Sequence, residues 1–359
     1  MKVGNMQTVT AAEIFATFCE HCNRFELLDM INDPLLLTEA ATGRVLFMNE
    51  KARSLYGYTK TEPEQLFIGQ IYCEAELMIG RMMKETIKAA EEGHIYTAYH
   101  QKKDGSVFKV QVNSKCLKFH GTEVLASLIR NITDDLRIRE EVMMAGKIQK
   151  RLLPLDFVND RLAMRTIYEP YYHVSGDLYD YSWDEERQCF SGYLADVTGH
   201  GLATALQTAA LKALFRQAWG KRRNLTDRLQ WLNREMMPYF TEECFAAAIL
   251  FEVDCRRNQL IYTSAGINFF LVRSGKTTRV VRVPGPFLGI LDEVDFEQHS
   301  HAYEPGDLIC FLSDGLFELL PRKDDMIEPA GQDLFSRLEK LIRSPDCRDD
   351  ATAILLAMK

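Results

Sequence analysis

Four acidic positions in the second half of the sequence stand beside glycine or at the edge of an apolar run. Asp177 lies in the stretch VSGDLYDY, Asp196 in LADVTGHG, Asp314 in DLICFLSDGLFELL, and Asp349 with Asp350 in RDDATAILLAM. A single aspartate beside glycine is common, because both residues favour turns. Four such acids at the ends of predicted strands are less easily explained by turn formation alone, because strands lying side by side would bring their carboxylates to one edge of the sheet.

Carboxylates gathered at one edge repel one another, and a hard divalent cation keeps them ionised. Ligands that are all oxygen suit magnesium or manganese. Other devices for phosphate chemistry are missing from the sequence: it has no cysteine-phosphatase loop, no G-x-x-x-x-G-K-[ST] motif and no G-x-S-x-G nucleophile elbow. The acids are therefore the best candidates for catalysis, through a metal site.

The composition of the 359-residue chain narrows the class of protein. Its length allows two or three folding units, and its 47% hydrophobic content supplies a core for each. The net charge of −8 argues against a nucleic-acid partner, which would need a basic patch. No apolar stretch is long enough to cross a bilayer, and the start of the chain lacks a secretory signal. We therefore expect a cytoplasmic protein without a membrane partner.

The cysteines carry little information. Nine cysteines without a regular spacing fit reduced thiols better than disulfides. Cys19 and Cys22, in the stretch CEHC, form the one suggestive pair. No two further ligands follow at the spacing of a zinc motif, so an ordinary helical segment is the favoured interpretation.

Apolar periodicity predicts the elements of the first half. Residues 1–24 indicate an N-terminal helical segment with one apolar face. Two short strands then form a hairpin with Asn49 at its exit, and a mixed helical region extends to about Glu92. The runs HIYTAYHQ, SVFKVQVNSKCLKF and EVLASLIRNIT, joined by KKDG and HGT, predict an antiparallel meander with one buried face.

A helical linker is predicted over residues 136–154, and Pro154 ends it. Its apolar residues form a stripe on one face: Ile138, Val142, Ala145, Ile148 and Leu152. The helix is either a solvated spacer or a short coiled coil that pairs two chains. The stripe favours pairing, although Gly146 and the short length weaken it.

A series of motifs runs through the first half in a fixed order: Asp33-Pro34, Thr42-Gly43-Arg44-Val45, Met48-Asn49, Tyr56-Gly57-Tyr58, Lys103-Asp104-Gly105-Ser106 and Asn131-Ile132-Thr133-Asp134. Together they resemble a PAS domain over residues 25–135. The resemblance implies a small α/β sensor whose cavity holds haem, flavin, a metabolite or nothing, so the PAS ligand stays unknown. The cysteine motif of the flavin-photoadduct subgroup is absent. His94, His100 and His120 lie in or beside predicted strands, where solvent-facing or hydrogen-bonded histidines are expected rather than haem ligands.

The second half also carries motifs in a fixed order: SGDLYD, ADVTGHGLATAL, FAAAILFEVD with QLIYTSAG, GPFLGI, EPGDLICFLSDGLFEL and DDATAILL. This order resembles the PPM-type metal-dependent serine/threonine phosphatases, and most of all their bacterial SpoIIE/RsbU branch. The preceding AGKIQKRLLP is similar to the linker that feeds that catalytic domain. For residues 155–359 the resemblance implies an α-β-β-α sandwich with two divalent metal ions, manganese or magnesium, between its sheets. The expected class is α+β, with a PAS domain, a helical and coiled-coil linker and this sandwich.

The resemblance also implies the roles of individual residues. It gives the metal ligands as Asp177, Asp196, the carbonyl of Val197, Asp314 and Asp349, with Asp196 bridging both ions. The ions would activate a water for attack on phosphoserine, without a covalent phosphoenzyme. His200 would contact the phosphate or donate a proton to the leaving serine, and a hydrogen bond that stabilises its turn is an equal alternative.

One departure concerns the segment after the second strand of the FAAAILFEVD and QLIYTSAG pair. Members of the branch usually carry Ala-Gly-His and then a proline-containing segment, whereas this chain reads Ser264-Ala265-Gly266-Ile267-Asn268-Phe269. The missing histidine bears on substrate recognition or pH dependence. All of the metal-bearing acids are present, so we expect activity.

The resemblance implies a regulated serine phosphatase. Its substrate would be a phosphorylated STAS-domain anti-anti-sigma factor, so that dephosphorylation controls a sigma factor in a stress or developmental response. PAS input would change how two linkers pair in a homodimer formed through the linker and PAS domain. The helix from Leu202 to Phe215 would pass this change to Asp196. The alternatives are a catalytically weak signalling scaffold and a hydrolase of small phosphoesters.

Overall fold

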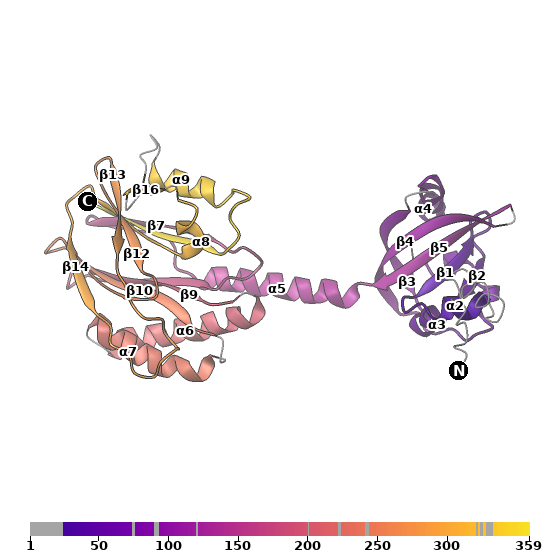
Figure 1. Ribbon diagram of the computed structural model, residues 1–359, viewed down its shortest axis with the longest axis horizontal. Helices are drawn as coiled ribbons and strands as arrows, with labels where there is room; N and C mark the ends of the chain where they lie inside the picture. The colour runs from indigo at the N-terminus through magenta and orange to yellow at the C-terminus, as the bar shows by residue number, and fades with distance from the viewer. Residues whose placement is uncertain are drawn as a thin grey trace, which may run out of the picture. The chain divides into compact units, whose positions relative to one another are not determined.

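The computed structural model describes residues 24–73, 76–89, 93–119, 121–199, 201–221, 224–240, 244–320, 322–323, 326–327 and 333–359. The predicted helix before residue 24, with Cys19 and Cys22, lies outside these residues, as do His120 and His200. The chain forms two compact units, Met1–Ile138 and Arg139–Lys359 (Figure 1). Within the described ranges, no helix is long and apolar enough to cross a membrane.

A five-stranded antiparallel sheet forms the N-terminal unit, in the order β2-β1-β5-β4-β3. Its strands are β1 (Leu35–Glu39), β2 (Val45–Met48), β3 (His94–Gln101), β4 (Val107–Phe119) and β5 (Thr122–Asn131). Its helices are α2 (Arg24–Asp29), α3 (Glu50–Tyr56) and α4 (Glu76–Lys88), with short 3-10 turns η1 (Pro63–Gln65) and η2 (Ile68–Gln70). The predicted hairpin and meander are both present, and alternate residues such as Val110 and Val112 of β4 are buried.

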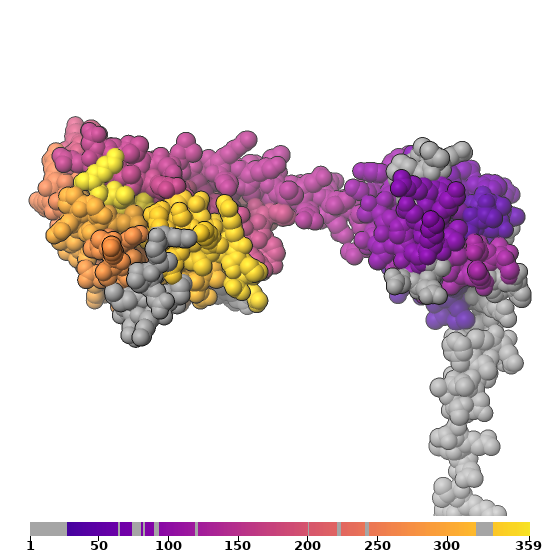
Figure 2. Space-filling view, turned by 90° about the horizontal axis from the view of Figure 1, so that it is seen from above, coloured from indigo at the N-terminus to yellow at the C-terminus, as the bar shows by residue number. Residues whose placement is uncertain are grey.

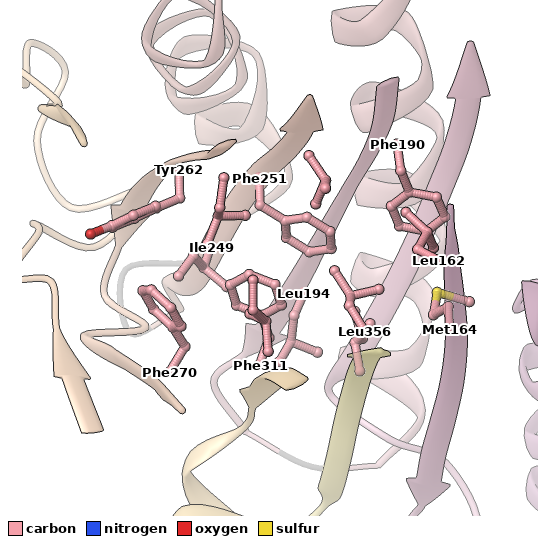
Figure 3. Close-up of a cluster of buried hydrophobic side chains, with 14 of the residues drawn as sticks. Leu162, Met164, Phe190, Leu194, Ile249, Phe251, Tyr262, Phe270, Phe311 and Leu356 are labelled. Atoms are coloured by element: carbon pink, nitrogen blue, oxygen red, sulfur yellow. The ribbon is translucent and has the colours of Figure 1, made fainter. Parts of the chain in front are cut away.

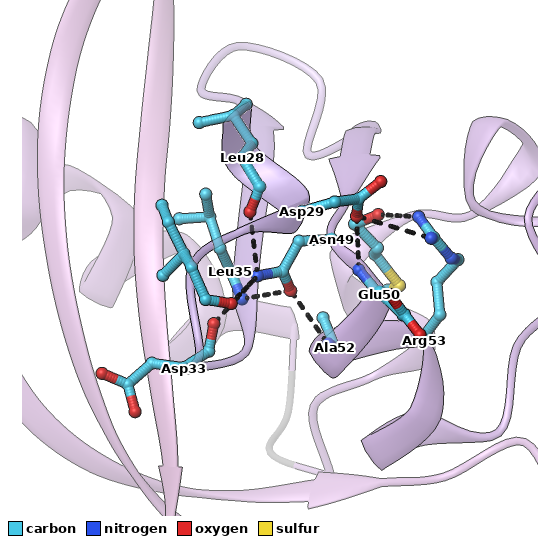
Figure 4. Close-up of polar contacts among 10 residues, drawn as sticks. Leu28, Asp29, Asp33, Leu35, Asn49, Glu50, Ala52 and Arg53 are labelled. Carbon is cyan, nitrogen blue, oxygen red and sulfur yellow. Dashed lines mark hydrogen bonds and ion pairs between the residues drawn. The ribbon is translucent and has the colours of Figure 1, made fainter. Parts of the chain in front are cut away.

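Asn49, at the exit of the hairpin, holds the start of this unit together (Figure 4). Its side-chain oxygen accepts hydrogen bonds from two backbone N–H groups, and its side-chain nitrogen donates to three carbonyls: the donors are Leu35 and Ala52, and the acceptors are Leu28, Ile31 and Asp33. Asn49 is fully buried. It therefore caps α3 and ties the segment before β1 to the sheet.

The predicted linker helix is α5 (Thr133–Leu152). None of its twenty residues is buried, and Ile138, Ile148 and Leu152 of the apolar stripe are each about half exposed. Gly146 lies directly against the backbone carbonyl of His173. The glycine that interrupts the stripe is therefore a packing contact between this helix and the C-terminal unit.

Two antiparallel sheets form the C-terminal unit, in the orders β14-β11-β10-β9-β8 and β16-β17-β13-β12-β15-β18-β7-β6. The first sheet comprises β8 (Asp177–Asp184), β9 (Cys189–Val197), β10 (Ala246–Asp254), β11 (Gln259–Ala265) and β14 (Gln298–Ala302). The second comprises β6 (Phe157–Val158), β7 (Leu162–Glu169), β12 (Phe269–Ser274), β13 (Thr277–Arg282), β15 (Leu308–Leu312), β16 (Arg322–Lys323), β17 (Met326–Ile327) and β18 (Ala351–Met358).

The two sheets face each other across an apolar core (Figure 3). Phe251 of the first sheet stacks on Phe311 of the second, with ring centroids 4.1 Å apart. Both side chains are fully buried. Burying a side chain of this size stabilises the fold by roughly 1.5–3 kcal/mol, so this core holds the two sheets in register.

Helices cover the outer faces of both sheets. α6 (Leu202–Lys221) and α7 (Leu225–Met236), followed by η3 (Met237–Tyr239), pack on the five-stranded sheet. α8 (Asp314–Phe317) and α9 (Leu334–Leu341) pack on the eight-stranded sheet. Part of the yellow C-terminal segment lies at the surface of this unit (Figure 2), whereas its last strand, β18, is almost wholly buried. This unit is thus the expected α-β-β-α sandwich, although α6 runs six residues beyond the predicted end at Phe215.

Candidate metal centre and active site

Asp177 and Asp196 face each other across neighbouring strands. They are directly paired in the antiparallel ladder of β8 and β9. Asp177 is 1% exposed, and neither of its carboxylate oxygens has a hydrogen-bond partner, although the Thr352 and Ser313 side chains lie near enough to favour its charged form. Burial and then the Asp196 carboxylate raise the pKa of Asp177. A buried carboxylate in this setting needs a positive partner to be ionised.

Gly176 makes room for the backbone beside these acids. A Cβ atom at this position would lie 2.5 Å from the carbonyl oxygen of Val197 and 3.1 Å from Oδ1 of Asp196. The N–H of Val197 donates to the carbonyl of Gly176 over 3.1 Å. The glycine before Asp177 is therefore required by the close approach of the Asp196-Val197 backbone, which places the Val197 carbonyl next to both acids.

Asp314 and Asp349 come from the second sheet. Asp314 begins α8 after β15, and Asp349 lies two residues before β18, which pairs with β15. Burial and then Asp349 raise the pKa of Asp314. Burial, followed by Asp314, Asp349 and Asp350, raises the pKa of Asp196 to about 7. The acids of the two sheets therefore lie within electrostatic range of one another at the same end of the sandwich.

The donor set suits a hard divalent cation. The carboxylates oppose one another's ionisation, and the oxygens of Asp177 have no hydrogen-bond partner. Carboxylate and carbonyl oxygens are the ligands that magnesium and manganese prefer. Among the residues that the structure describes, no three His, Cys, Asp or Glu side chains are arranged so as to hold one ion. The set Asp177, Asp196, Val197, Asp314 and Asp349 consequently stays a prediction.

Asp350 is a residue that sequence reasoning left without a role. Its carboxylate accepts hydrogen bonds from the N–H of Gly176 (2.7 Å) and from the N–H of Tyr171 (2.8 Å). The side chain is buried. Asp350 therefore fastens the start of β18 to the turn that presents Asp177. The doubled aspartate in RDDATAILLAM is the only sequence signal for it.

Gln149 of α5 is a second such residue. Its side-chain nitrogen donates to the carbonyl of Ser175 (2.7 Å) and to the hydroxyl of Thr208 in α6 (2.9 Å), and its side-chain oxygen accepts from the N–H of Ser175 (2.9 Å). Ser175 begins the Ser-Gly-Asp turn. One amide thus joins the linker helix, α6 and the turn before Asp177. No periodicity in the sequence marks it, because a glutamine on a helix is usually solvated.

A cavity of about 250 Å³ lies next to the acids. Its polar lining residues are Asp196, Thr198, Ser313 and Asp314. Its other walls are apolar and include Ile267, which stands where the branch usually has histidine. Ile267 is buried, and its carbonyl accepts a hydrogen bond from the Ser264 hydroxyl over 2.6 Å. The departure noted in the sequence therefore lies in the wall of the candidate active site.

Comparison with known proteins identifies both units. A family profile described as Stage II sporulation protein E (SpoIIE) matches residues 187–359, and a PAS-domain profile matches residues 32–134. The chain carries a PAS domain followed by a SpoIIE-type phosphatase domain. Both families expected from the sequence are confirmed, while the domain boundaries 24/25, 135/136 and 154/155 stay predictions.

Two proteins of Bacillus subtilis (strain 168) are similar to this chain in sequence. Phosphoserine phosphatase RsbP is 27% identical over 239 residues, which cover 62% of this chain and 59% of RsbP. Phosphoserine phosphatase RsbU is 26% identical over 213 residues, which cover 58% of this chain and 61% of RsbU. This chain thus spans about three fifths of the length of these relatives.

A solved structure shows the same fold as the phosphatase domain. The SiaA-PP2C domain of Pseudomonas aeruginosa is 19% identical with a TM-score of 0.51, and the match covers 64% of this chain and 99% of that domain. At this identity the likeness concerns the arrangement of sheets and helices. It supports the α-β-β-α sandwich of the C-terminal unit.

The raised pKa of Asp196 predicts that the metal-free protein is less stable at high pH. Between the unfolded value near 4 and the folded value of about 7, the folded state holds the proton more tightly, so the free energy of unfolding falls as pH rises through this window. We expect the Tm with chelator to drop by on the order of 3–5 °C from pH 5.5 to pH 8.0. Manganese at pH 8.0 should reverse the drop.

The control for this melting series is Asp196→Asn. It removes the titrating group, so the drop should shrink to the part that Asp177 and Asp314, whose pKa values are also raised, contribute. Differential scanning calorimetry at both pH values provides the measurement. An unchanged drop in Asp196→Asn would show that Asp196 is not the group responsible.

Proposed function

We propose that this chain is a metal-dependent phosphoprotein phosphatase that acts on phosphoserine and is regulated through its PAS domain. The pairing of Asp177 with Asp196 across β8 and β9, within electrostatic range of Asp314 and Asp349, is the observation that carries the proposal. The match to the SpoIIE family and the names of RsbP and RsbU support it.

The residues have separate roles in the proposed reaction. Asp177, Asp196, Asp314, Asp349 and the Val197 carbonyl would hold two divalent ions, manganese or magnesium. When bound, the ions lower the pKa of a water and offset the charge that develops on the phosphate oxygens. Thr198 keeps the turn after Asp196 in place, because its hydroxyl donates to the carbonyl of Phe245 and accepts from the same residue's N–H, both over 3.0 Å.

His200 lies outside the described residues. Its proposed roles stay those implied by the resemblance: contact with the phosphate, donation of a proton to the leaving serine, or a hydrogen bond that stabilises the turn.

The proposed substrate is a phosphorylated STAS-domain anti-anti-sigma factor, whose dephosphorylation would control a sigma factor in a stress or developmental response. The resemblance to the SpoIIE/RsbU branch supports this choice. The alternatives are a catalytically weak scaffold that binds the same partner and a hydrolase of small phosphoesters. The buried, unpartnered carboxylate of Asp177 favours an enzyme over a scaffold, because such a group is costly unless it binds a cation.

The test is release of phosphate from a phosphoserine-containing STAS protein by the purified full chain in manganese. Phosphate release that chelator abolishes and fresh manganese restores would support the proposal. A small phosphoester assayed in parallel distinguishes the phosphoprotein phosphatase from the hydrolase of small phosphoesters. The latter requires a higher kcat/KM on the small substrate than on the phosphoprotein. Binding of the phosphoprotein without any phosphate release would favour the scaffold.

Regulation is proposed to pass through α5 and α6. Gln149 connects α5 to the Ser175 turn and to α6, and α6 begins six residues after Asp196. Movement of α5 would therefore shift the turn that presents Asp177. Exposed apolar side chains on both helices, Ile148, Leu152, Leu202 and Leu206, suit pairing with a second copy. The proposed assembly is a homodimer through the linker and PAS domain.

Replacing Gln149 by leucine tests this connection. The substitution keeps the size of the side chain and removes all three hydrogen bonds to Ser175 and Thr208. We expect the manganese concentration for half-maximal activity to rise about tenfold, as for loss of a group that orients a ligand. Lys147→Ala, an exposed change on the same helix, is the matched control. An unchanged manganese requirement in Gln149→Leu would argue against coupling through this residue.

A further inference from the structure

The cavity beside Asp196 and Asp314 has a mixed lining. Besides its polar residues, Phe245, Ala247, Ile267, Phe269 and Phe287 form its apolar wall. Phe245 and Phe287 contact each other, with ring centroids 4.8 Å apart. Among the described residues that line the cavity none is basic. The acids and the apolar wall therefore line a single space.

Phe287 is held in this wall by the backbone around it. Gly266, in the left-handed region at φ +91°, lies under the ring, and a Cβ atom there would come within 2.4 Å of Cδ1 of Phe287. The neighbouring residue Leu288 exchanges two backbone hydrogen bonds with Ala246, of 2.9 and 3.0 Å. These backbone contacts therefore hold the Phe287 ring in the apolar wall.

The same loop is tied down on both sides of Phe287. The N–H of Gly285 donates to Oδ1 of Asn268 (3.0 Å), and the N–H of Gly289 donates to Oδ1 of Asn233 (2.8 Å). These bonds come from two different elements, the β11–β12 connection and α7. A preformed apolar surface of this kind, beside a few polar groups, is typical of a ligand-binding cleft.

We propose that this apolar wall binds an apolar side chain next to the phosphoserine of the substrate, and so selects the site that is dephosphorylated. The inference rests on the proposed phosphatase function, because the phosphate must then lie beside Asp196 and Asp314. The substrate residue next to the phosphoserine is then the group closest to the apolar wall.

Charge strengthens the selection. A carboxylate placed against Phe245, Ile267 and Phe287 would lose water without gaining a partner, which is costly. It would also face the carboxylates of Asp196 and Asp314 in the same cavity. Leucine, isoleucine or methionine beside the phosphoserine suits this lining, whereas aspartate does not.

The experiment compares phosphoserine peptides that are identical except for one residue, Leu, Asp or Lys, placed directly before or directly after the phosphoserine. Phosphate release gives kcat/KM in manganese for the full chain, and fluorescence anisotropy gives binding of the same labelled peptides. We expect the leucine peptide to be preferred over the aspartate peptide by about tenfold or more at one of the two positions.

Variants of Phe287 connect the preference to this wall. Phe287→Ala should lower the leucine-to-aspartate ratio to within about twofold of unity. Phe287→Asp, tolerable because the side chain is 36% exposed, should make the lysine peptide the preferred one. Leu291→Ala lies on the same loop, is 59% exposed and lines no part of the cavity, so it should keep the wild-type ratio.

Each outcome separates the two proposals. Turnover of all peptides with equal kcat/KM would overturn this inference and leave the phosphatase function standing. A leucine preference in binding, lost in Phe287→Ala but without turnover, would support the apolar site and overturn the phosphatase function. A preference that survives both Phe287 variants would also overturn the inference, because another surface would then produce it.

Discussion

Replacing Asp196 by asparagine is expected to reduce phosphoserine phosphatase turnover by on the order of 10³-fold. Burial and then the carboxylates of Asp314, Asp349 and Asp350 raise the pKa of Asp196. Asp196 also pairs with Asp177 across β8 and β9. Loss of its charge removes a carboxylate that would hold the ions, and about 4 kcal/mol of lost charge stabilisation corresponds to three factors of ten in rate. The measurement is kcat with a phosphoserine protein at saturating manganese.

Asparagine is nearly the same size as aspartate, so the fold should persist. Folding is checked by the Tm, which in chelator at pH 8.0 should not fall, because a carboxylate that opposes its neighbours has been removed. Asp160→Asn applies the same chemical change at an exposed position of the same domain and should leave turnover as in the wild type. Equal turnover in Asp196→Asn and Asp160→Asn would remove Asp196 from the catalytic machinery.

Asp350→Asn is expected to weaken manganese binding by about 10- to 100-fold, the range for residues that orient a metal ligand. The two carboxylate oxygens accept from Gly176 and Tyr171, and an amide offers only one acceptor. One buried N–H would therefore lose its partner, and the turn before Asp177 would lose its attachment to β18. Isothermal titration with manganese measures the change directly, without reference to turnover.

Two controls distinguish positioning from general loss of structure. Asp346→Asn lies in the same segment before β18, is exposed and should bind manganese as the wild type does. Restoring charge with Asp350→Glu should recover little, because the longer side chain displaces the carboxylate from both N–H groups. If Asp350→Asn binds manganese like the wild type, the fastening of the Ser-Gly-Asp turn has no bearing on the metal site.

Much of the secondary structure followed from the sequence because its signals are local. The strand Leu308–Leu312 ends directly before Ser313, at the strand end that the sequence predicts beside Asp314, since an apolar run of β-formers leads to a Ser-Asp-Gly turn. The start of α6 at Leu202 follows from the glycine turn before it. The helix extends beyond the predicted end at Phe215 as far as Lys221, because Gly220 is the one residue in this extension that strongly disfavours a helix.

The candidate site followed from the sequence only as residue types. Aspartate beside glycine at four strand ends predicts a cluster, but Asp349 and Asp350 have the same side chain and adjacent positions. The turn of the backbone before β18 decides that Asp350 points to Gly176, 174 residues away, while Asp349 lies beside Asp314. No periodicity encodes such a contact.

The sequence by itself determined the two domain families, the linker helix and the acids, because motif order and apolar period are properties of short segments. Only the tertiary structure decided the amide link from Gln149 to Ser175 and the closure of one cavity by Phe245, Ile267 and Phe287. These contacts join residues far apart in the chain, and the packing of two sheets and their helices, rather than any local preference, brings them together.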